Sequence, residues 1–528
     1  MNETFVTLAA SATLAVGVAA FARQRGWNMA MPLIIAGVIV GLLPVGPSAP
    51  PDPEIILVAV LAPLVFGEAL GSSYLDLRRV SRPVLALAIG LVVATTVVIG
   101  AVGAVLVAMP LAIAMALGAV LAPTDAVAVS AVARRAGLPR RLVSILEGES
   151  LVNDGTGLTA LKVALVAAAA GAVTIGEVTR VFVVAVVAGV AVGAVGGWIL
   201  AWVLRRSRDL VASNALVLVA PFLLYVVAEE LGGSGILAVV VAALMIAHSQ
   251  HSDPGHSGRV QSATVWRHIT FVLQALAFFL VGLEIPDVLI RLDSAEIRDV
   301  VILVPVVVVA LIVTRSAFVL VMVAVSHRGT DVRASRARIK GGAIIAWAGA
   351  RGPVSGLAAF SIPIFFATGE RVPFRDVILA TTFCIIVITL VLSLTLAPFA
   401  RLLRVASDDD EATLRRVDVM LARAALERLS DVESESADAG RPLPEEVSDR
   451  LRADVESRIQ IAAHPESVTA TQEIEVAQMI STARAMVRAE QEELLRLRDD
   501  EGLPDALVRP MLRALDVRDQ ALRTRGAG

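Results

Sequence analysis

Residues 141–170 read RLVSILEGESLVNDGTGLTALKVALVAAAA, a run that is long enough to cross a bilayer and yet carries three acidic residues. A membrane-spanning helix needs about 20 mostly apolar residues. A charged side chain at membrane depth costs about 2.5–3.5 kcal/mol on insertion scales, so an acid there requires a partner or a function. Glu147, Glu149 and Asp154 therefore make this run the centre of both the fold and the chemistry.

The composition of the whole chain agrees with a membrane protein. Of its 528 residues 56% are hydrophobic and 18% are charged, whereas soluble domains carry about 25% charged residues. The charges are also uneven: residues 405–528 hold 17 basic and 27 acidic residues, and residues 1–404 hold 29 basic and 22 acidic residues. We expect a transmembrane domain over 1–404 and an acidic, helical, cytoplasmic C-terminal domain over 405–528.

Apolar runs of spanning length predict an all-α membrane protein with thirteen transmembrane helices. The predicted spans are 4–22, 29–45, 54–71, 83–109, 111–133, 141–170, 178–204, 210–230, 234–248, 265–285, 300–325, 340–366 and 374–400. Connections after odd-numbered spans hold nineteen Lys and Arg residues and those after even-numbered spans hold five. Because basic residues mark the cytoplasmic side, we expect a plasma-membrane protein with its N-terminus outside and its C-terminus inside.

Polar residues within these spans predict a cation site. Ser150, Asn153 and Asp154 stand at positions i, i+3 and i+4, so they share one face of their helix. Two other spans contribute Glu68, in LAPLVFGEALGSS, and the pair Thr124 and Asp125, in LAPTDAVAVS. Several acids with few local bases, and only oxygen ligands among them, indicate a hard monovalent cation.

Two spans carry signs of a helix break. Pro123 precedes Thr124 in the fifth span, and Gly349 and Pro353 flank Arg351 in the twelfth. A proline lacks the amide that bonds one turn back, which interrupts a helix. The two spans are seven apart, so an inverted repeat would place both breaks at a midplane binding site, as in secondary transporters. A buried Arg351 needs an acid, and we expect an ion pair with Glu149.

Four motifs together resemble those of NhaP-type sodium/proton antiporters, the bacterial relatives of the animal sodium/hydrogen exchangers. They are PTDAVAVS at 123–130, EGESLVNDGTGL at 147–158, LVGLEIP at 280–286 and WAGARGPVSG at 347–356. The resemblance covers most of residues 1–404. It implies a homodimer in the bilayer, each protomer having a dimerisation part and an ion-translocating core with crossing interrupted helices.

The resemblance also implies a site that binds Na⁺ or another alkali cation in exchange for H⁺. Its ion-binding residues would be Asp154, Asp125, Glu68, Ser150 and Thr124; Asn153 would support Asp125, and Glu149 would pair with Arg351. An Asn before the transport Asp implies electroneutral exchange, one cation for one proton. The sequence departs from the family at Ala126, where relatives have proline, and at Glu68, which lies one position later than the family's acid.

Other functional classes lack their signatures. The single cysteine, Cys384, allows no disulfide and no cysteine-based metal site. The spans hold no hydrolytic constellation and the tail holds no glycine-rich nucleotide fingerprint, so we predict no enzyme activity, no cofactor and no nucleic-acid partner. A K⁺/H⁺ antiporter of the same mechanism and a cation channel stay open as alternatives to Na⁺ or Li⁺ exchange.

Overall fold

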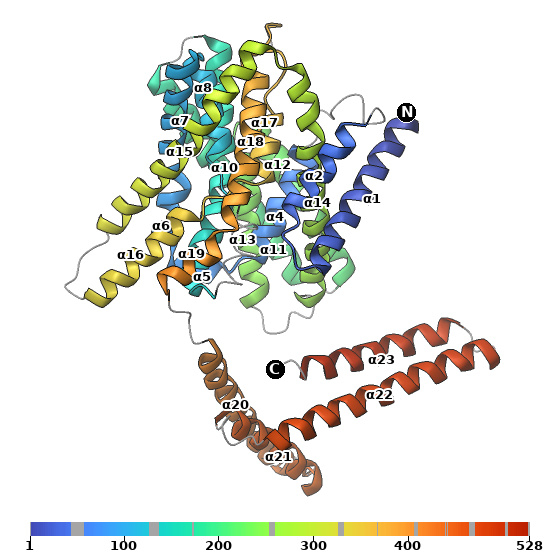
Figure 1. Cartoon of the computed structure of the whole chain (residues 1–528). Helices are drawn as coiled ribbons and strands as arrows, with labels where there is room; N and C mark the ends of the chain where they lie inside the picture. Colours follow the sequence, from blue (N-terminus) through green and yellow to red (C-terminus); the bar gives the residue numbers. More distant parts are fainter. Residues whose placement is uncertain are drawn as a thin grey trace. The chain divides into compact units, whose positions relative to one another are not determined.

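The computed structural model forms two compact units, Met1–Asp408 and Asp409–Gly528, and each is described by itself (Figure 1). The residues that it describes are 2–43, 57–125, 137–171, 174–207, 209–252, 259–325, 332–366, 368–405, 410–438, 440, 442–463, 470–501 and 505–525. Within these residues the chain is helical, and the only β pairing is an isolated bridge between Phe365 and Arg371.

The first unit is a bundle of helices, two of its segments being π-helical turns, η1 and η2. Its elements are α1 Asn2–Gln24, α2 Ala30–Gly41, η1 Leu57–Leu61, α4 Ala62–Gly71, α5 Tyr74–Arg79, α6 Ser81–Leu85, η2 Ala86–Leu91, α7 Val92–Val107, α8 Leu111–Leu121, α10 Arg140–Ala170, α11 Ile175–Arg206, α12 Leu210–Glu230, α13 Gly235–Ser252, α14 Arg259–Arg291, α15 Ser294–Val325, α16 Val332–Trp347, α17 Pro353–Phe360, α18 Arg375–Ser393 and α19 Leu396–Leu403.

Among the described residues seven helices are long and apolar enough to cross a membrane, which makes this a multi-pass membrane protein. They are the continuous run Ser81–Val107, α10, α11, α12, α14, α15 and α18, and four shorter apolar helices accompany them. The exact number of thirteen crossings stays a prediction. The part of the fifth span beyond Asp125 lies outside the described residues.

Both expected breaks have a visible part in the structure. Helix α8 ends at Leu121 and residues 123–125 are non-helical. The twelfth span is split into α16, which ends at Trp347, and α17, which begins at Pro353, with a non-helical segment over 348–352. Proline suits the first position of α17, where its missing amide has no intrahelical partner to lose. The glycine and proline around Arg351 therefore end one helix and start the next, as the sequence predicts.

Close packing between the helices sets the position of the site. Helix α2 lies along α14, and a Cβ at Gly37 or Gly282 would overlap the backbone of the facing helix. Small residues permit this close approach in membrane proteins. Helix α4 packs against α13 and α14, while α10 packs against α8, α11 and α13. Helix α10 is thus enclosed by neighbours, and more than half of its most apolar window is buried.

Over the described residues, 410–525 with their gaps, the second unit has four helices in two pairs. Helix α20, Asp410–Asp438, packs against α21, Glu445–Ala463, and α22, Ala470–Glu501, packs against α23, Asp505–Arg525. Polar contacts join each pair. The Glu433 carboxylate of α20 accepts hydrogen bonds from the Ser448 hydroxyl and, at 2.9 Å, from Arg452 of α21, and Arg484 bonds Asp519 at 3.0 Å in the other pair.

We expect the contact between α20 and α21 to weaken in acid. The Ser448 hydroxyl, and after it the Arg452 guanidinium, hold the pKa of Glu433 below its ordinary value of 4.5. A lowered pKa stabilises the folded state above the unfolded pKa, and that contribution is lost as the pH falls through the folded value. Amide exchange, corrected for its intrinsic pH dependence, should show lower protection of residues 428–452 at pH 4 than at pH 7.

The matched variant removes the charge at constant pH. Glu433→Gln should speed amide exchange across 428–452 at pH 7, whereas Glu427→Gln, an exposed acid of the same helix, should leave it unchanged. Equal exchange in the two variants would show that the Glu433 contact does not hold the pair together.

Candidate functional site

Helix α10 presents a buried polar face in the middle of the bundle. Glu149, Ser150, Asn153 and Asp154 all lie on it, and each is at most 2% exposed. Ser150, Asn153 and Asp154 lie about one turn apart, as their spacing predicts. Buried polar groups are tolerated where they find hydrogen-bond partners, so the contacts of these side chains define the site.

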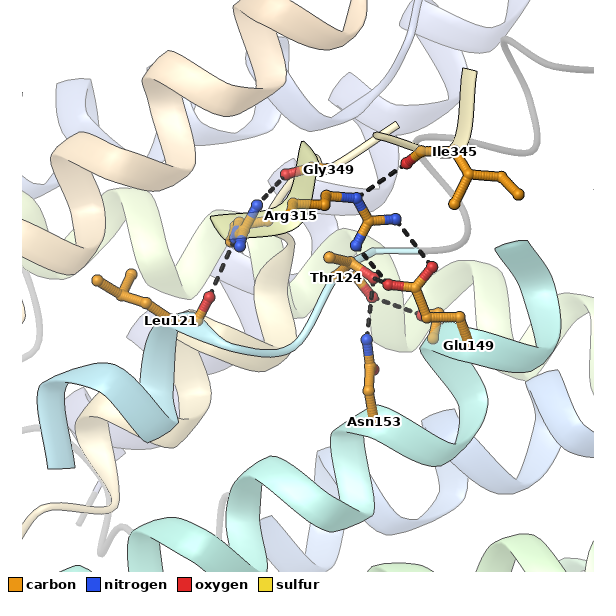
Figure 2. Close-up of polar contacts among 9 residues, drawn as sticks. Leu121, Thr124, Glu149, Asn153, Arg315, Ile345 and Gly349 are labelled. Atoms are coloured by element: carbon orange, nitrogen blue, oxygen red, sulfur yellow. Dashed lines mark hydrogen bonds and ion pairs between the residues drawn. The ribbon is translucent and has the colours of Figure 1, made fainter. Parts of the chain in front are cut away.

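Three residues of this face bind the non-helical segment that follows α8 (Figure 2). The Ser150 hydroxyl donates to the Thr124 carbonyl at 2.6 Å, and the Asn153 amide donates to the Thr124 hydroxyl at 2.9 Å. The Thr124 hydroxyl in turn donates to Glu149 Oε1 at 3.4 Å. Asn153 thus supports Thr124 directly, whereas the resemblance implied support of the neighbouring residue, Asp125. Together these bonds fix the first break to α10.

The two non-helical segments are joined to each other at Asp125. Its backbone amide donates to the Ala350 carbonyl at 2.8 Å, a bond between the first break and the second. Gly352 lies directly against the Asp125 side chain, because a Cβ at Gly352 would be 2.5 Å from Cβ, Cγ and Oδ2 of Asp125. Real Cβ atoms essentially never come so close, so the close approach of the two segments requires a glycine at position 352.

Arg351 does not form the expected ion pair with Glu149; it binds the backbone carbonyl at the end of α8 and one in the non-helical segment to which it belongs. Its Nε donates to the carbonyl of Leu121, the last residue of α8, at 3.0 Å, and its Nη1 donates to the Gly349 carbonyl. The final carbonyls of a helix lack intrahelical partners and carry a partial negative charge. The guanidinium therefore compensates the end of α8 and a carbonyl of its own non-helical segment, so its polar atoms are satisfied in a buried position by backbone oxygens.

Glu149 instead pairs with Arg315 of α15, a residue that the sequence analysis missed. Arg315 Nη2 donates to Glu149 Oε2 at 2.8 Å, Nη1 contacts Oε1, and the two side chains are 2% and 1% exposed. Arg315 Nε also donates to the Ile345 carbonyl near the end of α16, at 2.9 Å (Figure 2). The available signal was an arginine within the apolar run 300–325.

Three carboxylates lie within electrostatic range of one another. Asp154 interacts with Glu68 and with Asp125, and Glu68 interacts with Asp125. Glu68, on α4, accepts a hydrogen bond from Gln274 of α14 at 3.1 Å, and Gln274 is a second residue that the sequence analysis missed. Asp154 Oδ1 is buried and has no hydrogen-bond partner. Such an oxygen can take a proton or a cation.

The site is not a closed metal cage. Among the described residues no three His, Cys, Asp or Glu side chains converge closely enough to hold a metal ion. The arrangement offers carboxylate oxygens from three elements beside the hydroxyls of Thr124 and Ser150. Hard monovalent cations prefer such oxygen ligands, and loosely gathered acids suit a ligand that binds and leaves.

The fold has solved counterparts. It resembles the sodium proton antiporter MjNhaP1 from Methanocaldococcus jannaschii at a TM-score of 0.62, with 18% sequence identity, over 76% of this chain and 98% of that one. At this level of identity the likeness concerns the fold. The similarity extends over nearly the whole length of MjNhaP1.

Sequence relatives extend the comparison. The chain is 33% identical to a sodium, potassium, lithium and rubidium/H⁺ antiporter of Bacillus pumilus over 69% of its own length, and it spans 56% of that relative. It is 30% identical to an uncharacterised Na⁺/H⁺ exchanger of Mycobacterium tuberculosis, over 93% of this chain and 91% of that one. A family model described as sodium/hydrogen exchanger, transmembrane, matches residues 9–402. With this match over most of the transmembrane unit, the chain belongs to the sodium/hydrogen exchanger family.

Proposed function

We propose that this protein exchanges Na⁺, Li⁺ or another alkali cation for H⁺ across the plasma membrane, one for one, by alternating access at one carboxylate site. The observation that carries the proposal is Asp154: it is 2% exposed, one of its oxygens has no hydrogen-bond partner, and it lies within electrostatic range of Glu68 and Asp125. Asp125, Glu68, Ser150 and Thr124 complete the proposed cation site.

Competition at Asp154 is sufficient to couple the two fluxes. A proton or a cation neutralises the carboxylate, and a neutralised site crosses the low-dielectric interior far more readily than a charged one. The site therefore changes sides only when it carries one ligand or the other. Net exchange follows without a separate gate for each ion.

The one-for-one stoichiometry rests on what surrounds Asp154. Asn153 is neutral and bonds Thr124, so the residue before Asp154 adds no titratable group. Glu149, the other acid of this face of α10, is neutralised by Arg315. With Asp154 as the one carboxylate that exchanges its proton, and Glu68 and Asp125 keeping the same protonation state through the cycle, one cation replaces one proton and the cycle moves no net charge.

The choice of cation is a separate part of the proposal. Carboxylate and hydroxyl oxygens bind any alkali cation, and the Bacillus relative is named for sodium, potassium, lithium and rubidium. A K⁺/H⁺ antiporter of the same mechanism is therefore the main alternative. A cation channel is the other alternative, and it would need a repeated selectivity filter, which the sequence does not contain.

Orientation and assembly complete the proposal. The nineteen basic residues in connections after odd-numbered spans favour a cytoplasmic location for those connections and for the C-terminal residues 405–528. The N-terminus would then lie outside. The resemblance to dimeric antiporters supports a homodimer in the bilayer.

Exchange can be tested in liposomes that enclose a pH dye. Purified protein would be reconstituted, a pH gradient imposed, and NaCl, LiCl or KCl added, with the membrane potential set to different values in the sodium and lithium arms. Dye recovery with sodium at a rate independent of potential is the expected result. Recovery that follows the potential would contradict one-for-one exchange, and recovery with potassium alone would select the alternative.

A chain that ends at residue 404 should be measured in the same assay. It separates an inactive transporter from one that the C-terminal domain holds inactive. Absence of recovery with every cation, in both the full chain and the shortened one, would contradict the antiporter proposal.

Gly352→Ala should lower the exchange rate by about two orders of magnitude. The added methyl would overlap Asp125 at 2.5 Å, so Asp125 and the segment joined to it through the bond from its amide to Ala350 must shift. A displacement of about 1 Å at a reacting group can cost about a hundredfold in rate. Gly71→Ala is the control, because nothing lies within 4 Å of a Cβ there. Equal rates in the two variants would contradict the role of the crossing.

A further inference from the structure

Three consecutive residues of α4 contact α14 at positions one helical turn apart. The rings of Phe66 and Trp266 lie 5.0 Å apart between centroids. A Cβ at Gly67 would overlap the Thr270 hydroxyl and lie 3.0 Å from the Trp266 ring. The Gln274 amide donates to Glu68 Oε1 at 3.1 Å.

The α14 residues of this contact form one stripe along their helix. Trp266, Thr270 and Gln274 are spaced by four residues, so they share a face, and Trp266 and Gln274 are 4% and 7% exposed. The ring contact and the close approach at Gly67 fix the register of the two helices. Gln274 is thereby held opposite Glu68, the acid that lies one position later than in the family pattern.

The choice of an amide has a chemical consequence. A neutral N–H donor forms a strong hydrogen bond with a carboxylate and orients it, and it adds no positive charge. The other acid near the site, Glu149, is neutralised by a guanidinium and has no charge to offer a cation. Glu68 has a neutral partner, so its negative charge stays available to a cation shared with Asp154 and Asp125.

We propose that Gln274 is a positioning residue of the cation site, and that its amide holds the Glu68 carboxylate toward Asp154 and Asp125 and so sets the affinity for the cation. This inference rests on the proposed function. Gln274 acts on the cation through Glu68. The contacts of Trp266 and Thr270 with α4 keep Gln274 and Glu68 opposite each other.

The first test is the effect of Gln274→Leu, which keeps the side-chain bulk and removes the donor. Hydrogen bonds to charged groups contribute about 1.5–3 kcal/mol, which corresponds to a tenfold or larger change in an equilibrium constant. We expect KM for Na⁺ to rise about tenfold in the liposome assay, with the maximal rate unchanged. Val272→Ala, at a side chain of α14 that is 41% exposed and lies off this stripe, should leave KM as in the natural chain.

The second test asks whether the effect passes through Glu68. In a Glu68→Gln background, adding Gln274→Leu should change KM by less than twofold, because the carboxylate that it holds is gone. A tenfold change in that background, or equal KM values for Gln274→Leu and the natural chain, would overturn the inference.

A binding measurement keeps this test independent of transport. The rise in Tm of the purified full-length protein with NaCl concentration, at constant ionic strength, reports cation affinity directly. If the natural chain binds Na⁺ without exchanging protons, the antiporter proposal fails while the Gln274 test still stands. A Tm response in Gln274→Leu equal to that of the natural chain would reject the role of Gln274.

Discussion

Asp154→Asn is expected to reduce cation/proton exchange to the level of empty liposomes. Asparagine has the same shape, but it neither takes up a proton nor supplies a negative charge for a cation, so the shared carrier group is lost from the site. The carboxylate is 2% exposed and Oδ1 has no hydrogen-bond partner, so the substitution breaks no contact of that oxygen. The rate of dye recovery with sodium and with potassium is the measurement.

The protein should stay folded in this variant. We expect an unchanged gel-filtration profile and a Tm no lower than that of the natural chain, because removing a buried charge relieves its desolvation. Asp76→Asn, at a side chain that is 51% exposed on α5, is the control and should exchange at the full rate. Exchange by Asp154→Asn at a tenth or more of that rate would overturn the assignment of Asp154 as the shared carrier.

Arg315→Met is expected to lower the free energy of unfolding by about 3–5 kcal/mol, the usual effect of removing one partner of a buried ion pair. The pair is buried at 2% and 1% exposure, and the variant leaves the Glu149 carboxylate without its guanidinium. It also removes the donor to the Ile345 carbonyl. Denaturant titration in detergent micelles measures the loss.

A second substitution identifies the partner. Glu149→Gln should recover most of the stability lost in Arg315→Met, since the uncompensated charge is then absent. The same Glu149→Gln in an Arg351→Met background should recover none, because Arg351 binds the carbonyls of Leu121 and Gly349. Recovery in the Arg351 background alone would restore the pairing that the sequence first indicated.

Helix positions could be predicted where an apolar run has clear polar ends. The span expected at 210–230 is Leu210–Glu230, and the span expected at 141–170 is Arg140–Ala170. Helix α14 extends further than expected, from Arg259 to Arg291, because a helix continues into polar sequence where its backbone bonds are satisfied. Apolar composition defines the membrane-embedded part of a helix and leaves its extensions undetermined.

The candidate site shows the same division. Helical spacing was sufficient to place Ser150, Asn153 and Asp154 on one face, and the glycine and proline near Arg351 were sufficient to place a break. The partner of Glu149 was not predictable in this way, because the choice between Arg315 and Arg351 depends on how α15 and the broken span pack around α10. Gln274 was hidden for the same reason, since its contact with Glu68 joins residues 206 positions apart.

The bond from the Asp125 amide to the Ala350 carbonyl, together with the bond from Arg351 to the Leu121 carbonyl, links the segment after α8 to the non-helical segment between α16 and α17. Neither non-helical segment can move without the other, because separating them would leave backbone polar groups without hydrogen-bond partners inside the membrane. Any movement of the ion site relative to the surrounding helices must therefore take place at other contacts, which have no such hydrogen bonds between backbone groups. Asp125 therefore moves together with both segments and cannot change its position independently of them.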